Sequence, residues 1–548
     1  MTIDPTLEPA VTAPELEPAL SAAPVQKSVG LAHATSILAV GNVASRLLGF
    51  ARVILLSHYF GAQNGLVDAF TIAVTVPQDL YDLAISGHVN SALVPVLSEY
   101  ATRDDDELWH LVSALFGLVL MFASGIVLLL EAFAPQIIML YRGRTDAVLS
   151  QESFDLSVSL LRVTAPALLL LSLFAVLSGL LYSLKEFTWP AFGAALFNGT
   201  IVVSMVVLAP AIGIQGAAIG WVLGAVTQLL LQFGGLRRFP LKIPWRGIFS
   251  HPGIRRLGIL YVPVLASLVL DVLINRPFSY NMASQAGKGI IAYMDWATSL
   301  REFPMGLVGV AISIAILPTL ARLALRDEAR QEFKDTLGQG VRLALTLILP
   351  AAVGMFVLSG PLIGLIFEHG NFTATDTIVL SNVLRLYLLG IPFAAIDLIL
   401  IFAFYAVKDT FTPALVGVFS LLCYMGAALL LRPTLSFYSL MAADSLKLLI
   451  HMTICLILLR RRFGDLGSQH FPLTLVKVAL ATTVMALVAY AVEKSVLVLW
   501  PVEGLFQRIL LVAIPSALAG TAYFVLASLL KVNEFTWFVE AIRHKLSR

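Results

Sequence analysis

The chain has 548 residues, of which 58% are hydrophobic and only 13% are charged, and its formal net charge is +2. A soluble protein carries roughly 25% charged residues, so this composition excludes a soluble globular protein. Apolar stretches recur along nearly the whole length, and a spanning helix needs about 20 such residues, so we predict an all-α polytopic membrane protein.

The N-terminal segment, residues 1–28, is rich in proline, alanine and glutamate. It lacks the basic segment followed by an apolar segment that is typical of a signal peptide. It also cannot bury enough apolar surface to offset the entropy lost on ordering. We therefore expect residues 1–28 to form a disordered cytoplasmic tail.

Fourteen apolar segments follow this tail, each long enough to span a bilayer. Their approximate ranges are 31–60, 66–98, 108–140, 153–183, 187–210, 214–236, 256–276, 289–321, 337–367, 379–407, 411–431, 437–459, 473–493 and 506–530. Loops after the even-numbered segments are richer in lysine and arginine than loops after the odd-numbered ones. Because basic loops stay in the cytoplasm, we predict that both termini are cytoplasmic.

The first segment contains Arg46 and Arg52 in the stretch SRLLGFAR (45–52). Even on the mildest insertion scale, an arginine at mid-bilayer costs about 2.5–3.5 kcal/mol. At about 100° per residue, the two arginines lie about 60° to either side of Gly49. We predict that this sector faces a polar cavity; the alternative is structural salt bridges to Asp68 or Asp82 of the second segment.

Other ionisable residues also fall within the predicted spans. In the second half they are Asp271, Arg276, Asp295, Arg301, Glu302, Asp397, Asp444 and Lys447. Asp444 and Lys447 are three residues apart on one helix, so we expect them to neutralise each other. We interpret His88, Cys423 and Cys455 as structural, and we predict neither a metal site nor a cofactor.

An internal repeat relates the two halves of the chain. Its matching residues are all separated by the same number of positions, the number that separates Pro95 from Pro318. The stretch SALVPVLSEYA (91–101) is similar to IAILPTLARLA (314–324), and Arg162, Tyr182, Lys185 and Pro190 match Arg385, Tyr405, Lys408 and Pro413. Six segments separate the copies, so both have the same orientation, as in transporters built from parallel repeats. We predict two six-helix lobes around a central cavity, followed by two additional helices.

Gly216, Gly220 and Gly224 in GAAIGWVLG follow one another at intervals of four residues on the sixth segment. This spacing lets another helix approach closely. We predict a structural packing face here and no chemistry.

Signatures of enzymes are missing from the sequence. It contains no G-x-x-x-x-G-K-[ST] phosphate loop, no G-x-S-x-G motif and no metal-binding spacing of histidines and cysteines. Transport would therefore draw on an ion gradient or on the membrane potential. We predict a transporter that is not an enzyme, with a monovalent ion as a candidate partner.

Several stretches resemble the MurJ/MviN family of lipid II flippases, within the MOP transporter superfamily. They are SRLLGFAR (45–52), FGAQNGLVDAF (60–70), VPQDLYDLAISGHVNSALVPVLSEY (76–100) and LREFPMGLVGVAISIAILPTLARLA (300–324). The resemblance extends over about residues 31–530. It implies fourteen helices in the bacterial cytoplasmic membrane, two six-helix lobes around a cationic cavity, and a last helix pair that forms a groove for the lipid tail.

The expected division of the chain combines this resemblance with the repeat. It comprises the tail 1–28, a first lobe 29–238, a basic cytoplasmic linker 239–255, a second lobe 256–462, the last helix pair with its lipid-tail groove 463–532, and a cytoplasmic C-terminus 533–548.

The resemblance implies that lipid II, an undecaprenyl-pyrophosphate disaccharide-peptide, is moved from the inner to the outer leaflet by alternating access. The implied substrate-binding residues of the cavity are Arg46, Arg52, Asp68, Gln78, Arg301 and Glu302. Candidate coupling or cavity charges are Asp82, Asp271, Arg276, Asp295 and Asp397. Guanidinium groups pair well with pyrophosphate. Membrane lipids are expected partners and nucleic acid is not, and we expect a monomer.

The sequence departs from the family pattern at two places. In the second segment the family usually has asparagine and arginine where this chain reads Gln78, Tyr81, Asp82 and Ser86. In the eighth segment the family's arginine falls on Ser299, and Arg301 lies about 200° further around the helix. The alternatives are therefore a flippase for another polyprenyl-pyrophosphate-linked saccharide and a MATE-like ion-coupled drug exporter. A membrane glycosyltransferase is disfavoured because no large extramembrane loop is predicted.

Overall fold

The computed structural model describes residues 26–84, 93–103, 105–142, 151–237, 253–254, 269–464, 471–500, 504–532 and 534. These ranges consist of helices joined by short turns, and no strand occurs within them. The predicted all-α fold is thus confirmed.

The helices fall into two successive sets and a final pair. The first set is α1 (Gln26–Phe60), α2 (Leu66–Ala84), α3 (Val94–Arg103), α4 (Asp105–Ala132), α5 (Ala134–Arg142), α6 (Gln151–Thr164), α7 (Pro166–Ser183), α8 (Thr188–Ile212) and α9 (Gln215–Leu236). The second set is η3 (Asp271–Asn275), α11 (Arg276–Ala286), α12 (Ile290–Pro304), η4 (Met305–Gly309), α13 (Val310–Leu323), η5 (Asp327–Ala329), α14 (Arg330–Val357), α15 (Ser359–Phe367), α16 (Ala374–Leu388), α17 (Ile391–Ala406), α18 (Phe411–Leu435) and α19 (Tyr438–Phe463). The final pair is α20 (Phe471–Leu499) and α21 (Leu505–Leu529).

Twelve helical segments in the described ranges are long and apolar enough to cross a membrane. They coincide with twelve of the fourteen predicted spans, so the protein is a multi-pass membrane protein. The predicted span 66–98 corresponds to α2 and α3, with residues 85–92 outside the described ranges, and most of 256–276 also lies outside them. The count of fourteen stays a prediction.

The helix boundaries follow the repeat found in the sequence. α8 and α18 have the same length, and the shift that brings Pro95 onto Pro318 also superimposes their bounds. Residues with left-handed backbone recur at the same offset: Lys185 and Lys408 have φ angles of 61° and 60°, and Gly213 and Ser436 have φ angles of 63° and 52°. The two halves therefore repeat the same local structure at these positions.

The glycine face of α9 packs directly against α8, as the spacing predicts. A Cβ atom built on Gly220 would lie 2.7 Å from the Cβ atom of Ser204, closer than two carbon atoms can approach. Cβ atoms built on Gly216 and Gly224 would come within 2.9 Å of atoms of α8. The absence of side chains at these positions thus sets the distance between the two helices.

We expect Gly220→Ala to destabilise the protein, because the new methyl group would force α8 and α9 apart. Overpacking of this kind costs about 1–3 kcal/mol. Gly520 on α21 is the matched control, since a Cβ atom there would meet nothing within 4 Å. Thermal unfolding in detergent should show a lower Tm for Gly220→Ala and an unchanged or higher Tm for Gly520→Ala. Equal Tm values for the two variants would contradict this account of the packing.

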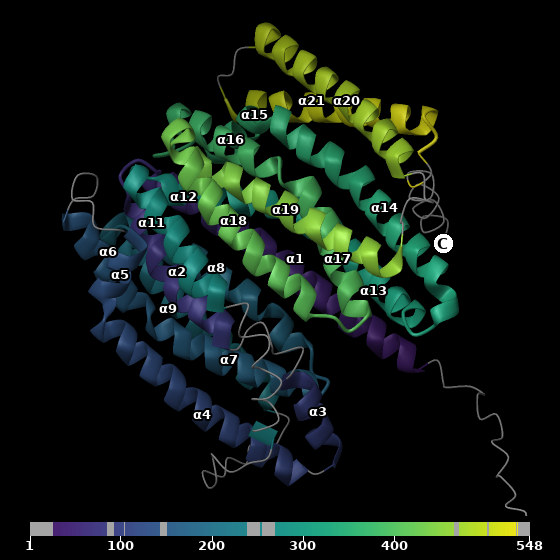
Figure 1. The fold of residues 1–548 in the computed structure, drawn as a ribbon. Helices are drawn as coiled ribbons and strands as arrows, with labels where there is room; N and C mark the ends of the chain where they lie inside the picture. The colour runs from purple at the N-terminus through teal and green to yellow at the C-terminus, as the bar shows by residue number, and fades with distance from the viewer. Residues whose placement is uncertain are drawn as a thin grey trace, which may run out of the picture.

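The helix α1 crosses the middle of the molecule between α2–α9 and the helices α13–α19 of the second set, whereas α11 of the second set lies beside α5 (Figure 1). α1 packs along α8 of its own half, and its last turns reach α15 of the second half. Other contacts between the halves join α5 to α11 and α2 to α12. The halves therefore meet where α1 ends and where α2 and α12 begin.

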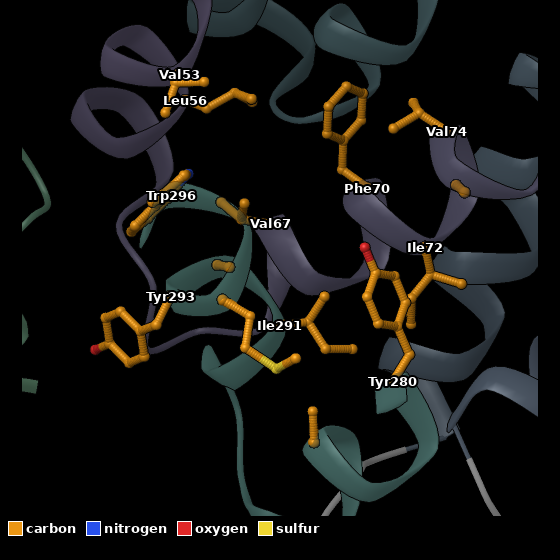
Figure 2. Close-up of a cluster of buried hydrophobic side chains, with 14 of the residues drawn as sticks. Val53, Leu56, Val67, Phe70, Ile72, Val74, Tyr280, Ile291, Tyr293 and Trp296 are labelled. Carbon is orange, nitrogen blue, oxygen red and sulfur yellow. The ribbon is translucent and has the colours of Figure 1, made fainter. Parts of the chain in front are cut away.

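A shared hydrophobic core holds the two halves together at this end (Figure 2). α1 and α2 contribute buried apolar residues such as Val53, Leu56 and Phe70, and α12 contributes Ile291 and Trp296. Burial of apolar surface stabilises by about 25 cal/mol per Å². The core therefore favours the arrangement in which the halves touch at this end.

The final helices α20 and α21 lie at the outer edge of the second half, away from α4–α6 (Figure 1). They pack on α14 and α15. The Tyr523 hydroxyl of α21 donates a hydrogen bond to the Thr346 carbonyl oxygen at 2.6 Å, and Arg508 Nη1 donates to the Gly364 carbonyl oxygen at 2.6 Å. The described contacts thus anchor the pair to the second half.

Candidate functional site

A cavity of about 460 Å³ lies between α1 of the first half and the α12–η4 segment of the second half. Three charged residues contribute to its wall, namely Arg46 and Arg52 on α1 and Glu302 on α12. Gly49 lies between the two arginines, and Ser299 faces them from α12. The helices that form the cavity therefore come from both structural copies.

Arg46 presents its guanidinium group directly to the opposite wall of this cavity. A Cβ atom built on Gly306 of η4 would lie 2.4 Å from Arg46 Nη1, so the guanidinium occupies the space beside this glycine. The Arg46 side chain is exposed, and within the described residues its guanidinium has no hydrogen-bond or ion-pair partner. Its five N–H donors are therefore available to an anion.

Arg52 is held in a fixed position by its own half. Its Nη1 donates a hydrogen bond to Asn198 Oδ1 of α8 at 3.1 Å, and its Cζ lies 5.1 Å from the ring centroid of Trp221 on α9. A guanidinium that is stacked and hydrogen-bonded in this way loses little further entropy when it binds a ligand.

Acidic side chains on the helices around the cavity oppose these arginines. Asp295 of α12 lies within electrostatic range of Arg52 and of Arg276. Arg276 of α11 forms an ion pair with Asp79 of α2, with Nε 3.8 Å from Oδ2. The charges thus balance across the boundary between the halves, and movement of one half relative to the other would change these pairings.

Aromatic side chains line the cavity on the side of the shared core. Phe50 makes edge-to-face contacts with Phe303 at 5.8 Å and with Phe367 at 6.3 Å, measured between ring centroids. Trp296 stacks on Phe367 at 5.9 Å. These rings belong to both halves, and Phe50 and Phe303 are the two that line the cavity within the described residues.

Asp68 does not line the cavity. Its buried carboxylate accepts hydrogen bonds from the backbone nitrogen of Gly289 at 2.6 Å and from that of Ala292 at 2.9 Å. These are N–H groups at the start of α12, where a helix lacks internal acceptors and favours a negative charge. Asp68 of the first half therefore caps a helix of the second half.

Loops complete this contact between the two halves. We call the contact region the closed end and define it as residues 58–65, 287–292 and 368–376. The Asn371 backbone nitrogen donates to the His58 carbonyl oxygen at 2.9 Å, and Gln63 Nε2 donates to Asp376 Oδ1 at 3.1 Å. Gly61, with φ of 59°, allows this approach because a Cβ atom there would lie 2.4 Å from the Asn371 carbonyl oxygen. Backbone and side-chain hydrogen bonds thus join the halves here.

Arg301 points away from the cavity into the second half. Its Nη1 is 2.5 Å from Asp444 Oδ2, and its Cζ lies 4.9 Å from the ring centroid of Tyr387. Lys447 Nζ lies 2.7 Å from Asp444 Oδ1, so the predicted pairing of Lys447 with Asp444 is present. Ser299 and Arg301 lie on nearly opposite faces of α12, since two residues turn a helix by about 200°, and this explains why only Ser299 reaches the cavity.

The remaining predicted residues lie elsewhere. Gln78 Nε2 donates to Asp82 Oδ2 at 3.2 Å along α2. Asp397 pairs with His451 inside the second half, with Oδ1 2.6 Å from Nδ1. The side chain of Asp271 lies outside the described part of the structure.

A long apolar groove of about 730 Å³ lies on the outside of the second half, next to the first residues of α20. Its walls come from α14, α17, α19 and α20, and include Leu349, Phe393, Leu456 and Leu475. Arg460 at the C-terminal end of α19 is a charged residue of its lining. The groove thus combines an apolar length with a cationic side chain.

A model of the family described as "Lipid II flippase MurJ" matches residues 56–511, which is most of the chain. The chain belongs to the MurJ family. A probable lipid II flippase MurJ of Buchnera aphidicola is 28% identical over 510 residues, covering 91% of this chain and 97% of that protein. The lipid II flippase MurJ of Burkholderia cenocepacia is 30% identical over 389 residues, covering 69% of this chain and 73% of that protein.

Solved structures support the MurJ fold. A structure of lipid II flippase MurJ in an inward closed conformation matches with a TM-score of 0.74 and 23% identity, covering 90% of this chain and 99% of that one. An inward-facing MATE family transporter of the MOP superfamily matches with a TM-score of 0.62 and 16% identity, covering 77% of this chain and 95% of that one. The chain therefore shares its arrangement of helices with both structures.

Three residues that contact arginines in or near the cavity of this MurJ family member were not singled out from the sequence: Asp79, which pairs with Arg276, and Asn198 and Trp221, which contact Arg52. Asp79 follows Asp68 by eleven residues, which is about 20° around a helix, so an analysis of helix faces would have found it. Asn198 and Trp221 reach Arg52 only because α8 and α9 pack on α1. No local signal in the sequence indicates that packing.

Proposed function

We propose that this protein is a flippase that moves lipid II across the bacterial cytoplasmic membrane, and that it acts as a transporter without catalysing a reaction. The observation that carries the proposal is the pair of arginines, Arg46 and Arg52, at a cavity between the two halves of a MurJ-family bundle. Charges inside a membrane are costly and mark functional sites. A pyrophosphate supplies the oxygens that such guanidinium groups bind in pairs.

The two arginines would divide the task of binding the headgroup. The Arg46 guanidinium, which has no partner among the described residues, is free to form two parallel hydrogen bonds to a phosphate group. Arg52, which is fixed by Asn198 and Trp221, would provide a rigid second contact. Glu302 on the facing wall would accept hydrogen bonds from sugar hydroxyl or peptide N–H groups.

The apolar groove beside α20 is proposed to hold the polyprenyl tail. A hydrocarbon chain gains about 0.8 kcal/mol for each CH₂ group that it buries. The groove lies on the outside of the second half, so a tail bound there stays in lipid while the headgroup is in the cavity. Residues 463–532, which contain α20 and α21, would form one border of this groove.

Alternating access is the proposed transport mechanism, with lobes 29–238 and 256–462 rocking against each other. If both termini are cytoplasmic, α1 ends on the periplasmic side, and the closed end seals that side. Opening the closed end would break the Asp68 cap on α12, and closing the opposite end would complete the cycle. We propose that the protein performs this cycle as a monomer.

Rescue of bacteria depleted of their own lipid II flippase tests the proposal. The full chain, expressed from a plasmid, should restore growth and cell shape, and membrane fractionation should confirm that it is present. Failure to rescue while the protein is present and folded would exclude lipid II as the substrate. In that event, rescue of a strain that lacks a flippase for another polyprenyl-pyrophosphate-linked saccharide would support that saccharide as the substrate. Ser299, which stands where the family has an arginine, suggests this alternative.

A further inference from the structure

A second group of ionisable side chains lies inside the second half, apart from the central cavity. It consists of Asp397 on α17 with His451 and Cys455 on α19, all of which are buried. Asp397 Oδ1 lies 2.6 Å from His451 Nδ1, and Cys455 Sγ lies 3.7 Å from the same nitrogen. His451 is near the middle of α19, which runs from Tyr438 to Phe463.

Both ring nitrogens of His451 face acceptor groups. Nε2 is 3.1 Å from the carbonyl oxygen of Pro413, which can only accept, so Nε2 carries a hydrogen. Nδ1 and Asp397 Oδ1 are 2.6 Å apart, and two lone pairs would repel at that distance, so a second hydrogen lies between them. The pair therefore holds one exchangeable proton, which belongs to the two groups together.

The pair also borders a space that water can enter. A pocket of about 300 Å³ is lined by Asp397 and His451 and by three further polar residues, Asn275, Ser420 and Lys447. A water molecule occupies about 30 Å³ in the liquid and needs two to four polar partners inside a protein. The pocket satisfies both conditions, so a water molecule in it can accept a proton from the pair or donate one to it.

A line of charged residues connects this pocket to the cavity wall. Asp444, Lys447, His451 and Cys455 lie within about 80° of one another around α19, given about 100° per residue. Lys447 lines the pocket and also pairs with Asp444, and Asp444 pairs with Arg301 of α12. α12 is the helix that presents Glu302 to the central cavity.

We propose that the His451–Asp397 pair is the proton-binding site that couples lipid transport to the proton gradient; this inference rests on the proposed flippase function. When the proton leaves to a water molecule of the pocket, the electron pair stays behind and the pair becomes negatively charged. Lys447, one helical turn from His451, then turns from Asp444 towards the pair. Asp444 is then paired with Arg301 alone, so the Arg301–Asp444 ion pair between α12 and α19 strengthens and α12 moves relative to α1.

Few other charges face the pair. On α19 the neighbouring titratable groups are Asp444, Lys447 and Cys455, and on α17 Asp397 is itself a member of the pair. α18 presents Ser420 and the Pro413 carbonyl oxygen, and η3 presents Asn275; these groups do not titrate near neutral pH. Within the described part of this pocket, Lys447 is thus the charged neighbour that responds to the proton.

A zinc ion is the competing ligand for these three residues, because a metal-binding histidine also donates its other nitrogen to a carbonyl group. Two ligands at about 2.0 Å from a tetrahedral zinc ion lie about 3.3 Å from each other. The separation of 2.6 Å between Nδ1 and Oδ1 is shorter and fits a shared proton. The geometry therefore favours the proton.

The test compares transport with and without a pH gradient in vesicles that contain the purified full-length protein and fluorescent lipid II. We expect the wild-type rate to change by up to about tenfold for each pH unit, whereas Asp397→Asn and His451→Gln should show no response. Asp397→Glu keeps the carboxyl group and should retain the response. His110→Gln, at an exposed position on α4, is the matched control and should behave like the wild type.

Infrared difference spectra between acidic and alkaline buffer, recorded without lipid II, provide an independent measurement. A carboxyl or imidazole band that titrates in the wild type and disappears in both Asp397→Asn and His451→Gln supports the proposal, even if lipid II is not transported. Transport by the variants with the full response to the gradient would overturn the coupling role while leaving the flippase function intact. Zinc bound in a one-to-one ratio and lost in Asp397→Asn would also overturn it.

Discussion

Arg46→Ala and Arg52→Ala should each abolish rescue of flippase-depleted cells without loss of the protein from the membrane. Each variant removes a guanidinium that faces the cavity. A hydrogen bond to a charged group contributes about 1.5–3 kcal/mol, and two parallel bonds to a phosphate would contribute more. Each variant should therefore slow transport by at least tenfold, measured with fluorescent lipid II in vesicles.

Lysine at the same positions separates charge from geometry. Arg46→Lys keeps a positive charge at a site where the arginine has no protein partner among the described residues, so it should retain partial activity. Arg52→Lys loses the hydrogen bond to Asn198 and the stacking on Trp221, so it should be more severely impaired. Arg162→Ala, on the exposed side of α6 next to Glu131, is the control and should rescue fully. Equal rescue by Arg46→Ala, Arg52→Ala and the control would refute the cationic cavity.

Asp68→Ala should shift the protein away from the conformation in which the closed end is sealed. The substitution leaves the backbone N–H groups of Gly289 and Ala292 without their acceptor. Loss of a helix cap costs about 0.5–2 kcal/mol, and a buried donor without a partner costs about 1–3 kcal/mol. Because about 1.4 kcal/mol changes an equilibrium tenfold, the sealed population should fall by about tenfold or more.

A pair of engineered cysteines reports this shift. Gln63→Cys and Thr373→Cys, on the two loops that meet at the closed end, should react with a short bismaleimide in a background that carries Cys423→Ala and Cys455→Ala. Cross-linking should fall in Asp68→Ala and fall less in Asp68→Asn, which keeps one oxygen acceptor. Glu107→Ala, on the exposed surface of α4, should leave it unchanged. Undiminished cross-linking in Asp68→Ala would show that the Asp68 cap does not keep the closed end sealed.

The fold was largely predictable because its signals are local and periodic. Apolar segments of spanning length predicted twelve of the helices that the structure describes. The constant offset between matching residues predicted that the halves are copies, and the structure adds that the matched residues Lys185 and Lys408 share a left-handed backbone. Gly216, Gly220 and Gly224 predicted close packing, since the missing side chains leave a flat helix face.

The site was predictable only in part, because a charge inside a membrane reveals its importance but not its partner. The cost of desolvation singled out Arg46 and Arg52 from the sequence, and the resemblance to the family added Asp68. The sequence could not show that Asp68 binds the first turn of α12, far away along the chain. Likewise, Arg301 appeared to belong to the cavity until the position of Asp444 on α19 was known.

The placement of α20 and α21 makes the molecule asymmetric, although its two halves arise from a repeat. The described contacts of this pair anchor it to the second half, and the large apolar groove lies beside it. A long-chain lipid would therefore approach and depart through the same flank in every cycle. If the groove binds the lipid tail, a bulky group attached to that flank should block transport, although the two halves of the scaffold are copies of each other.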